Sequence, residues 1–263
     1  MHPHSPFERP RRQIEREFGV PVPGEILPGS EWTQTGYKSF PPPGWLDFPS
    51  IFGRTAPLML DIGCGNGRST LASSVWRPQV DHFSSDVLPV VIRYATRRAN
   101  QRGLSNVRFA VIGGRELLAD YIAPHSISEI HVYHPQPYYE ADQVHRRLIT
   151  PEFVTLVHRS LITGGQFILQ TDNPGYWKYM QQIVPMFFEW EVHADRWPDA
   201  PKGRTRREII ALRQSLPVFR GIGHPRSDIS AEQILKLAET LPPPTFDADR
   251  RLRALDKLER ESS

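Results

Sequence analysis

Residues 58–67 read Leu-Met-Leu-Asp-Ile-Gly-Cys-Gly-Asn-Gly, and this stretch decides the fold class. Its first five residues form a short apolar run that is typical of a buried strand. The three glycines that follow at alternate positions permit a tight turn and let the backbone come close to a ligand. We therefore expect a buried strand that leads through a ligand-binding loop into a helix over residues 68–76.

Strand and helix patterns alternate through the central part of the chain. Further strands are expected at 80–85, 106–111, 128–133 and 166–171, and helices at 87–102, 115–121, 151–161 and 174–188. Alternation at this spacing predicts an α/β fold in which a parallel sheet carries helices on both faces.

Three parts are predicted along the chain. Residues 1–57 form a Pro-rich N-terminal extension, which cannot hold long helices and whose aromatic residues are expected to pack on the core. The α/β domain is expected at 58–220. A C-terminal helical extension is expected at 221–263, with its last helix at 246–258.

Composition limits the protein class. The 263 residues are 39% hydrophobic and 23% charged, as in ordinary globular proteins, and the net charge of +3 does not by itself indicate a nucleic-acid partner. The single cysteine, Cys64, excludes a disulfide framework and a multi-cysteine zinc site; no metal is expected, and Cys64 is interpreted as a small loop residue. The sequence shows no apolar run long enough for a membrane span and no secretory signal. We expect a cytoplasmic monomer or homodimer without a membrane partner.

Two acidic residues accompany the glycine loop. Asp61 precedes it, and Asp86 lies 25 residues further on, at the end of the second expected strand. The spacing is not the G-x-G-x-x-G of dinucleotide sites, and Asp61 would repel a pyrophosphate, which disfavours a nicotinamide-dependent dehydrogenase. S-adenosylmethionine carries a cationic amine and a ribose diol, and these groups match the two acids. The alternative is a glycine-rich turn in which Asp86 only caps a helix.

With these features the chain resembles the tRNA (guanine-N7)-methyltransferase family of the bacterial type, whose members methylate a guanine in the variable loop of tRNA. The similarity extends over about residues 56–220. The matching segments are 61–67, Asp86, Gly-Leu-Ser-Asn-Val-Arg at 103–108, Gly164 and Gly165, Thr171 and Asp172, Tyr176 or Tyr179 with Met180, and Thr-Arg-Arg-Glu at 205–208.

The resemblance implies a Rossmann-like class I S-adenosylmethionine-dependent methyltransferase with a seven-stranded, mostly parallel sheet, acting on guanine N7 in tRNA. Catalytic roles are expected for Gln136 and Asp172. Cofactor contacts are expected from Asp61, Gly63, Gly65, Gly67, Asp86, Gly113, Gly114 and Gln136. Substrate contacts are expected from Glu140, Asp172, Thr205, Arg206, Arg207 and Glu208, with Asp172 and Glu208 accepting from N1-H and the amino group of guanine.

The chain departs from the family pattern at two places. Gly113 stands where the family has an acid that faces the adenine. The strand-four motif, Phe-Pro-Asp-Pro-Trp in the family, reads His-Pro-Gln-Pro-Tyr at 134–138, and the basic stretch that should follow contains Glu140 and Asp142. These two acids predict weakened tRNA binding.

Positive charge concentrates in two other segments. Lys202, Arg204, Arg206, Arg207 and Arg213 are the best candidates for binding phosphate. Arg93, Arg97, Arg98 and Arg102 recur at helical spacing and form a second candidate, and Tyr138 and Tyr139 could stack on a base. The alternative for the charges is a solvated surface.

Three function classes therefore stay open. Guanine N7 has a lone pair and no proton, so its methylation needs positioning rather than a general base. The Pro-Gln-Pro-Tyr stretch at 135–138 loosely resembles the motif of enzymes that methylate exocyclic amines, whose amine would donate to the Gln136 carbonyl. The third class is a non-catalytic protein that kept the fold and lost the substrate loop.

Overall fold

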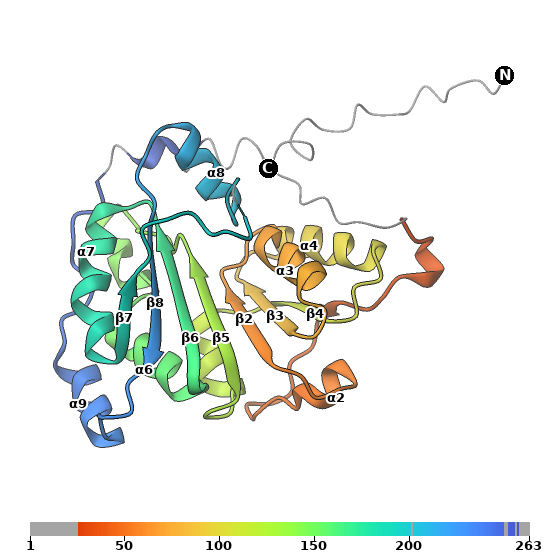
Figure 1. Ribbon diagram of the computed structural model, residues 1–263, viewed down its shortest axis with the longest axis horizontal. Coiled ribbons are helices and arrows are strands. Elements are labelled where there is room, and N and C mark those ends of the chain that lie inside the picture. Colours follow the sequence, from red (N-terminus) through yellow and green to blue (C-terminus); the bar gives the residue numbers. More distant parts are fainter. Residues whose placement is uncertain (1–25, 201, 250–251, 256, 258–263) are drawn as a thin grey trace.

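Strand β2 (Leu58–Ile62) lies in the middle of the sheet, and all five of its residues are buried. The computed structural model describes residues 26–200, 202–249, 252–255 and 257. In this part of the chain one sheet has the strand order β1-β4-β3-β2-β5-β6-β8-β7 (Figure 1). The Rossmann-like α/β fold expected from the sequence is confirmed, with helices on both sides of the sheet.

The sheet is mostly parallel. Its other strands are β1 (Gly36–Tyr37), β3 (Asp81–Asp86), β4 (Val107–Val111), β5 (Ile127–Tyr133), β6 (Leu161–Thr171), β7 (Phe188–Val192) and β8 (Phe219–Pro225). Only β8 is antiparallel to its neighbours β6 and β7 among the strands that the structure describes. The sheet has eight strands instead of the expected seven, because the two residues of β1 pair with Phe109 and Ala110 of β4.

The helices expected between residues 68 and 188 occur in the predicted order. The helices of the described residues are α2 (Phe48–Phe52), α3 (Arg68–Trp76), α4 (Pro89–Gln101), α5 (Gly114–Glu116), α6 (Pro151–Ser160), α7 (Pro174–Ile183), α8 (Arg206–Arg213) and α9 (Ala231–Thr240), with short turns η1 (Gly29–Glu31), η2 (Leu117–Tyr121), η3 (Ala141–Arg146) and η4 (Val184–Met186). Of these, α2, α8 and α9 were not predicted. The helix expected at 174–188 ends earlier, because η4 and then β7 take over its last residues.

Two hydrophobic clusters cover the two faces of the sheet. Phe109 and Ala110 are neighbours on β4 but belong to different clusters, because successive side chains of a strand point to opposite faces. The smaller cluster joins β4 to α3 and α4, whereas the larger one joins the sheet to α6 and α7.

Part of the N-terminal extension packs on the core, as its aromatic residues predicted. The ring of Tyr37 lies 5.6 Å from that of Phe83, and Phe40 lies 4.8 Å from Tyr121. Trp45 instead is 68% exposed. Residues 1–25 lie outside the described residues, as do 250, 251, 256 and 258 of the helix expected at 246–258. Residues 246–249 of that expected helix are not helical, whereas 253–255 are helical.

The parallel strands determine where a site can form. The carboxyl ends of β2, β3, β4, β5 and β6 meet at one edge of the sheet, at the top of Figure 1, where α8 also lies. Ligands of open α/β sheets bind at this edge.

Candidate active site

The glycine loop after β2 borders open space. Gly63 and Gly65 have φ angles of 76° and 54°, and beyond the chain neighbours no heavy atom lies within 4 Å of the place that a Cβ would take at either residue. A Cβ on Gly67 would come within 2.7 Å of the Cβ of Ala95 on α4. The first two glycines thus leave room for a ligand, whereas Gly67 lets α4 pack closely.

Asp61, the acid before this loop, is a buried carboxylate with one unused oxygen. Its side chain accepts a hydrogen bond from the Thr70 hydroxyl at 2.7 Å, but Oδ1 is buried without a hydrogen-bond partner. Burial raises the pKa of Asp61 to about 7, although the Thr70 hydrogen bond acts in the opposite direction. A buried acceptor of this kind fits a ligand that brings a cationic donor.

Asp86, at the end of β3, is held against the same loop. Its Oδ2 accepts from the backbone N–H of Gly65 at 3.0 Å, and its Oδ1 accepts from the N–H of Leu88 at 2.9 Å. Each carboxylate oxygen can accept a second hydrogen bond, so the residue can still bind a diol.

The two glycines after β4 differ in their surroundings. A Cβ on Gly114 would lie 2.1 Å from Cγ2 of Ile62, so no side chain fits there. Gly113 has more space, and the carboxylate of Glu116 lies 4.0 Å from where its Cβ would be, beside Val87. Glu116 therefore offers, from the first turn of α5, a carboxylate near the position where the family acid is missing. The sequence pattern did not single it out.

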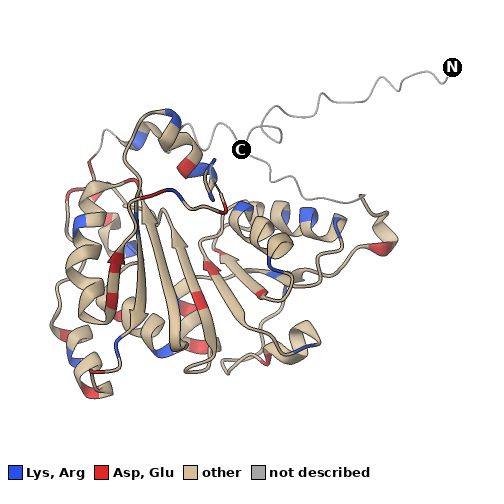
Figure 2. Ribbon diagram, viewed as in Figure 1, with Lys and Arg blue, Asp and Glu red and all other residues tan. Residues whose placement is uncertain are grey.

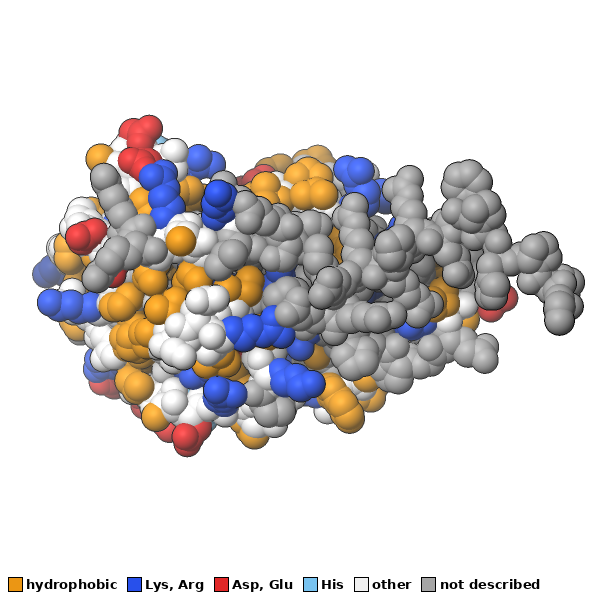
Figure 3. All heavy atoms as spheres, turned by 90° about the horizontal axis from the view of Figure 1, so that it is seen from above, with side chains coloured by type: hydrophobic (Ala, Val, Ile, Leu, Met, Phe, Trp, Pro, Cys, Tyr) orange, Lys and Arg blue, Asp and Glu red, His pale blue; other side chains and the backbone are white. Residues whose placement is uncertain are grey.

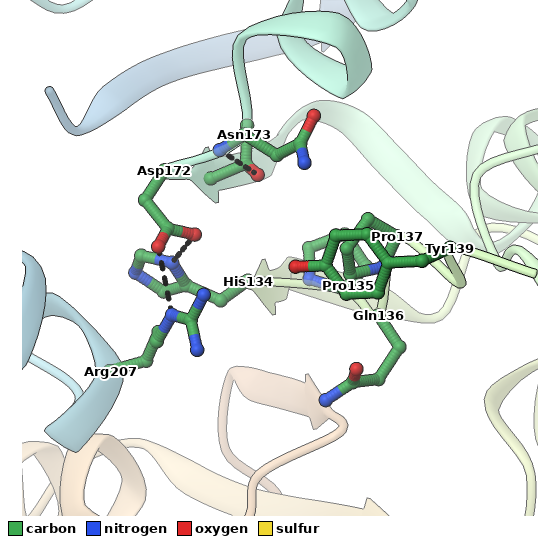
Figure 4. A pocket seen from close by; sticks show the side chains of 9 residues that line it. His134, Pro135, Gln136, Pro137, Tyr139, Asp172, Asn173 and Arg207 are labelled. Carbon is green, nitrogen blue, oxygen red and sulfur yellow. Dashed lines mark hydrogen bonds and ion pairs between the residues drawn. The ribbon is translucent and has the colours of Figure 1, made fainter. Parts of the chain in front are cut away.

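A pocket opens between the ends of β5 and β6. It is lined by His134, Pro135, Gln136, Pro137, Tyr139, Thr171, Asp172, Asn173 and Arg207. In Figure 4 the side chains of His134, Asp172 and Arg207 point toward one another, whereas the exposed Gln136 points away from them. Three predicted site residues, Gln136, Asp172 and Arg207, thus line one pocket.

Asp172 is ionised and has a partner on each oxygen. His134 Nδ1 lies 3.1 Å from Oδ1, and Arg207 Nε donates to Oδ2 at 2.8 Å. Burial alone would raise the pKa of Asp172, but the hydrogen bond from His134 and the charge of Arg207 hold it well below its usual range. The helix α7 is capped by Asn173, not by Asp172.

A buried hydrogen-bond chain orients His134. The Trp197 indole donates to Oε1 of Gln170 at 2.6 Å, and Nε2 of Gln170 lies 2.8 Å from Nε2 of His134. Because an indole can only donate, it fixes the Gln170 amide, whose NH₂ then donates to His134. His134 is left as the neutral tautomer with its proton on Nδ1, facing Asp172. The sequence marked His134 only as a departure from the family phenylalanine.

The expected phosphate-binding cluster is only partly on the surface, which corrects that prediction. Arg206 and Arg207 are 8% and 6% exposed, and Arg207 is paired with Asp172. The Arg204 guanidinium lies 4.1 Å from the Trp197 ring centroid and donates to the Tyr133 hydroxyl at 2.8 Å. Lys202 and Arg213 are exposed.

Thr205 and Glu208 form the start of α8. The Thr205 hydroxyl accepts from the Glu208 backbone N–H at 3.0 Å, as an N-cap does. Glu208 is 1% exposed; its Oε1 accepts from Arg220 at 2.5 Å and its Oε2 from the Arg204 N–H at 2.7 Å. Because Glu208 is almost fully covered, guanine could reach it only if neighbouring residues moved, so the contact expected from the sequence stays a prediction.

Charge on the outside of this edge is mixed. Figure 2 shows Lys and Arg along α4 and α8, and Arg93 and Arg97 on α4 are exposed. In Figure 3, which looks down onto this edge of the sheet, the visible acidic side chains lie mostly at the periphery of the molecule. Glu140 is paired with Arg253 at 2.6 Å.

The described residues give little support for metal chemistry or for a nucleophilic cysteine. No group of three or more His, Cys, Asp or Glu residues there could hold a metal ion, and no described helix is long and apolar enough to cross a membrane. Burial and the nearby Asp61 and Asp86 raise the pKa of the Cys64 thiol, which is the opposite of what a nucleophile needs.

Comparison with known proteins assigns the family. A family model described as "Putative methyltransferase" matches residues 55–219. The tRNA (guanine-N(7)-)-methyltransferase of Pseudoalteromonas atlantica is 33% identical over 173 residues, which are 65% of this chain and 71% of that protein. The Escherichia coli enzyme of the same name is 32% identical over 182 residues, 67% of this chain and 74% of that protein.

The chain belongs to the tRNA (guanine-N(7)-)-methyltransferase family. A relative of that name from Mycobacterium ulcerans is 37% identical over 133 residues, 50% of this chain and 48% of that protein. Among solved structures, the 16S rRNA methyltransferase KamB matches with a TM-score of 0.52 at 14% identity, over 69% of this chain and 94% of that one, which supports the methyltransferase fold. The family match contains the glycine loop and the pocket but ends before most of β8 and the segment after it.

Proposed function

We propose that the chain transfers a methyl group from S-adenosylmethionine to N7 of a guanine in tRNA. The observation that carries this proposal is the buried, unpartnered Oδ1 of Asp61 beside an open glycine loop. It occurs in a member of a family whose curated relatives are named tRNA (guanine-N(7)-)-methyltransferases.

The residues around the glycine loop fit the cofactor. Asp61 would accept from its amine, and Asp86 from its ribose hydroxyls, since each oxygen of Asp86 has a free lone pair. Gly63 and Gly65 would let the backbone lie against it, and Glu116 offers an acceptor for the adenine amino group. When bound, S-adenosylmethionine supplies a methyl group activated by a sulfonium charge.

The pocket at β5 and β6 suits a substrate that needs to be oriented and not deprotonated. Guanine N7 carries a lone pair and no proton, so the protein has only to align it with the methyl group. His134 is held by Gln170 and has no free nitrogen to act as a general base. The Gln136 amide, which offers both donors and an acceptor, can hold a base edge.

Asp172 is the best candidate for recognising guanine. It is kept ionised by His134 and Arg207, and each of its oxygens retains a lone pair. An ionised acceptor favours the donor edge of guanine, formed by N1-H and the amino group, over the acceptor edge of cytosine.

The test is product analysis with the full-length protein. Incubation with methyl-labelled S-adenosylmethionine and unmodified tRNA, followed by digestion to nucleosides, should give 7-methylguanosine. Methyladenosine as the product would instead support the amine-methylating alternative suggested by residues 135–138. Cofactor binding without any labelled nucleoside would support a non-catalytic protein.

A further inference from the structure

The chain returns to the active-site edge after its last strand. Residues 241–249 run from α9, at the bottom of Figure 1, along α7, and residues 252–255 lie beside α8 at the top. We call the described residues 242–249 and 252–255 the strap. The Tyr179 hydroxyl donates to the carbonyl of Pro242 at 2.9 Å, and the Phe246 ring stacks on Tyr176 at 4.6 Å between centroids. The strap lies beyond residue 219, where the family match ends.

One buried arginine joins the strap to the loop after β5. Arg147 is 3% exposed, and its guanidinium donates to the carbonyls of Pro137 and Tyr138 in the loop. It also donates to Pro244 and Phe246 in the strap, at 2.7 and 3.0 Å, and lies 3.8 Å from the Phe246 ring centroid. Arg147 is therefore a structural cation, and the strap is part of the pocket's surroundings.

Further contacts bring the strap beside the substrate pocket. The Asn173 side chain, next to Asp172, donates to the carbonyl of Ala248 at 2.6 Å. A Cβ on Gly175 would lie 2.2 Å from the Asp247 carbonyl, so the backbones touch. Leu252 and Leu255 are buried against Ile209 and Ile210 of α8; the four form one apolar cluster.

These contacts place Arg253 beside the acidic residues that follow the pocket. Glu140 and Asp142 come directly after Tyr139, which lines the pocket, and their negative charge opposes the approach of a polyanion. Arg253 of the strap pairs with Glu140 at 2.6 Å and lies 6.0 Å from the Tyr139 ring centroid, yet its side chain remains 58% exposed. Arg146, which is exposed, lies 5.2 Å from the ring centroid of Tyr138.

We propose that the strap forms part of the RNA-binding surface, and that Arg253 neutralises Glu140 and contacts the phosphate backbone of the substrate RNA. This inference rests on the proposed function, because it takes the substrate to be tRNA. The exposed guanidinium at the pocket rim is the group that a phosphate would meet, and the apolar seat of Leu252 and Leu255 on α8 fixes its position.

The experiment compares two charge reversals in the full-length protein. R253E and R226E both replace an arginine that is ion-paired with an acid, the half-buried Glu140 or the exposed Asp228, and change the net charge equally. Arg226 follows β8 at the opposite edge of the sheet. Binding of an unmodified tRNA transcript is measured over a series of salt concentrations. R253E should weaken binding about three- to tenfold and flatten the plot of log K against log salt by about 0.7–0.9 or more, whereas R226E should change neither.

The outcomes separate this proposal from the proposed function. Equal tRNA affinity and salt slope in R253E and R226E would overturn the role of Arg253. If R253E lost cofactor affinity or folded structure, R253Q would decide instead, since it removes the cation without placing a carboxylate beside Glu140; an unchanged salt slope in R253Q would overturn the proposal. A wild-type protein that binds tRNA but makes no 7-methylguanosine would contradict the proposed function and leave the strap inference standing.

Discussion

At the level of single residues, Asp61 shows how a ligand site lowers the stability of the fold that contains it. Burial raises its pKa to about 7, whereas an aspartate in an unfolded chain titrates near about 4. Because the folded state holds the proton more tightly, stability falls as the pH rises from about 4 to about 7, and the whole loss persists above that range. A bound cationic amine would offset this loss.

Replacing Asp61 by asparagine should therefore act in two directions. Without ligand at pH 8, D61N should be more stable than wild type by about 1–3 kcal/mol, because a buried uncompensated charge is gone, and the gain should vanish as the pH falls to about 4. Its affinity for S-adenosylhomocysteine should fall about 10- to 100-fold and lose its rise between about pH 6 and pH 8. Thermal unfolding and calorimetry check both parts, with D228N as the exposed control. Unchanged affinity in D61N would refute the amine contact.

Asp172 calls for a different substitution. Alanine would remove the carboxylate that pairs with the buried Arg207, which costs about 3–5 kcal/mol, so a loss of activity could reflect unfolding alone. Asparagine keeps the shape and one acceptor. We expect D172N to lower kcat/KM for tRNA about 100-fold while its affinity for the cofactor stays within about threefold. If D172N retained wild-type kcat/KM, Asp172 would not be a guanine ligand.

The residues of the pocket show where sequence reasoning stops. Asp61, Asp86 and the glycines follow from local spacing, because they lie within one strand–loop–helix unit or at the end of the next strand. The Trp197–Gln170–His134 chain joins three separate segments, and no local pattern reveals it. Likewise, nothing in the sequence at 205–208 shows that the charges of Arg207 and Glu208 are already neutralised by Asp172 and Arg220.

At the level of elements, strands with apolar runs were predictable and β8 was not. Its residues Phe219–Pro225 include Gly221 and Gly223, so it lacks the alternation of a half-buried strand. The structure gives the reason for these glycines. A Cβ on Gly221 would lie 2.1 Å from the Trp190 ring, and a Cβ on Gly223 would lie 3.0 Å from Cβ of Phe188. Large side chains of β7 occupy the space that β8 leaves free.

This packing predicts the effect of a small substitution. G221A should lower the free energy of unfolding by about 1–3 kcal/mol, because the added methyl group must displace Trp190. G29A is the matched control, since no heavy atom lies within 4 Å of a Cβ at Gly29 beyond its chain neighbours. Urea denaturation of both variants measures the difference. Equal stability of G221A and wild type would show that β7 can shift freely.

At the level of the whole molecule, functional groups gather at one edge although they come from distant parts of the chain. The parallel strands bring the glycine loop, Asp86 and Asp172 to this edge, which the strand–helix alternation predicted. Helix α9 and the strap were not predicted in this arrangement, because residues 217–263 lack strong periodicity and their position depends on the contacts of Arg147 and Asn173.

The central claim is that the methyl group goes to N7 of guanine, and a substrate without that atom tests it most directly. Methyl transfer from labelled S-adenosylmethionine is measured on tRNA transcripts in which 7-deazaguanosine replaces guanosine, beside transcripts in which 7-deazaadenosine replaces adenosine. The account predicts transfer to ordinary and 7-deazaadenosine transcripts and none to the 7-deazaguanosine transcript. Undiminished transfer to the 7-deazaguanosine transcript would contradict it.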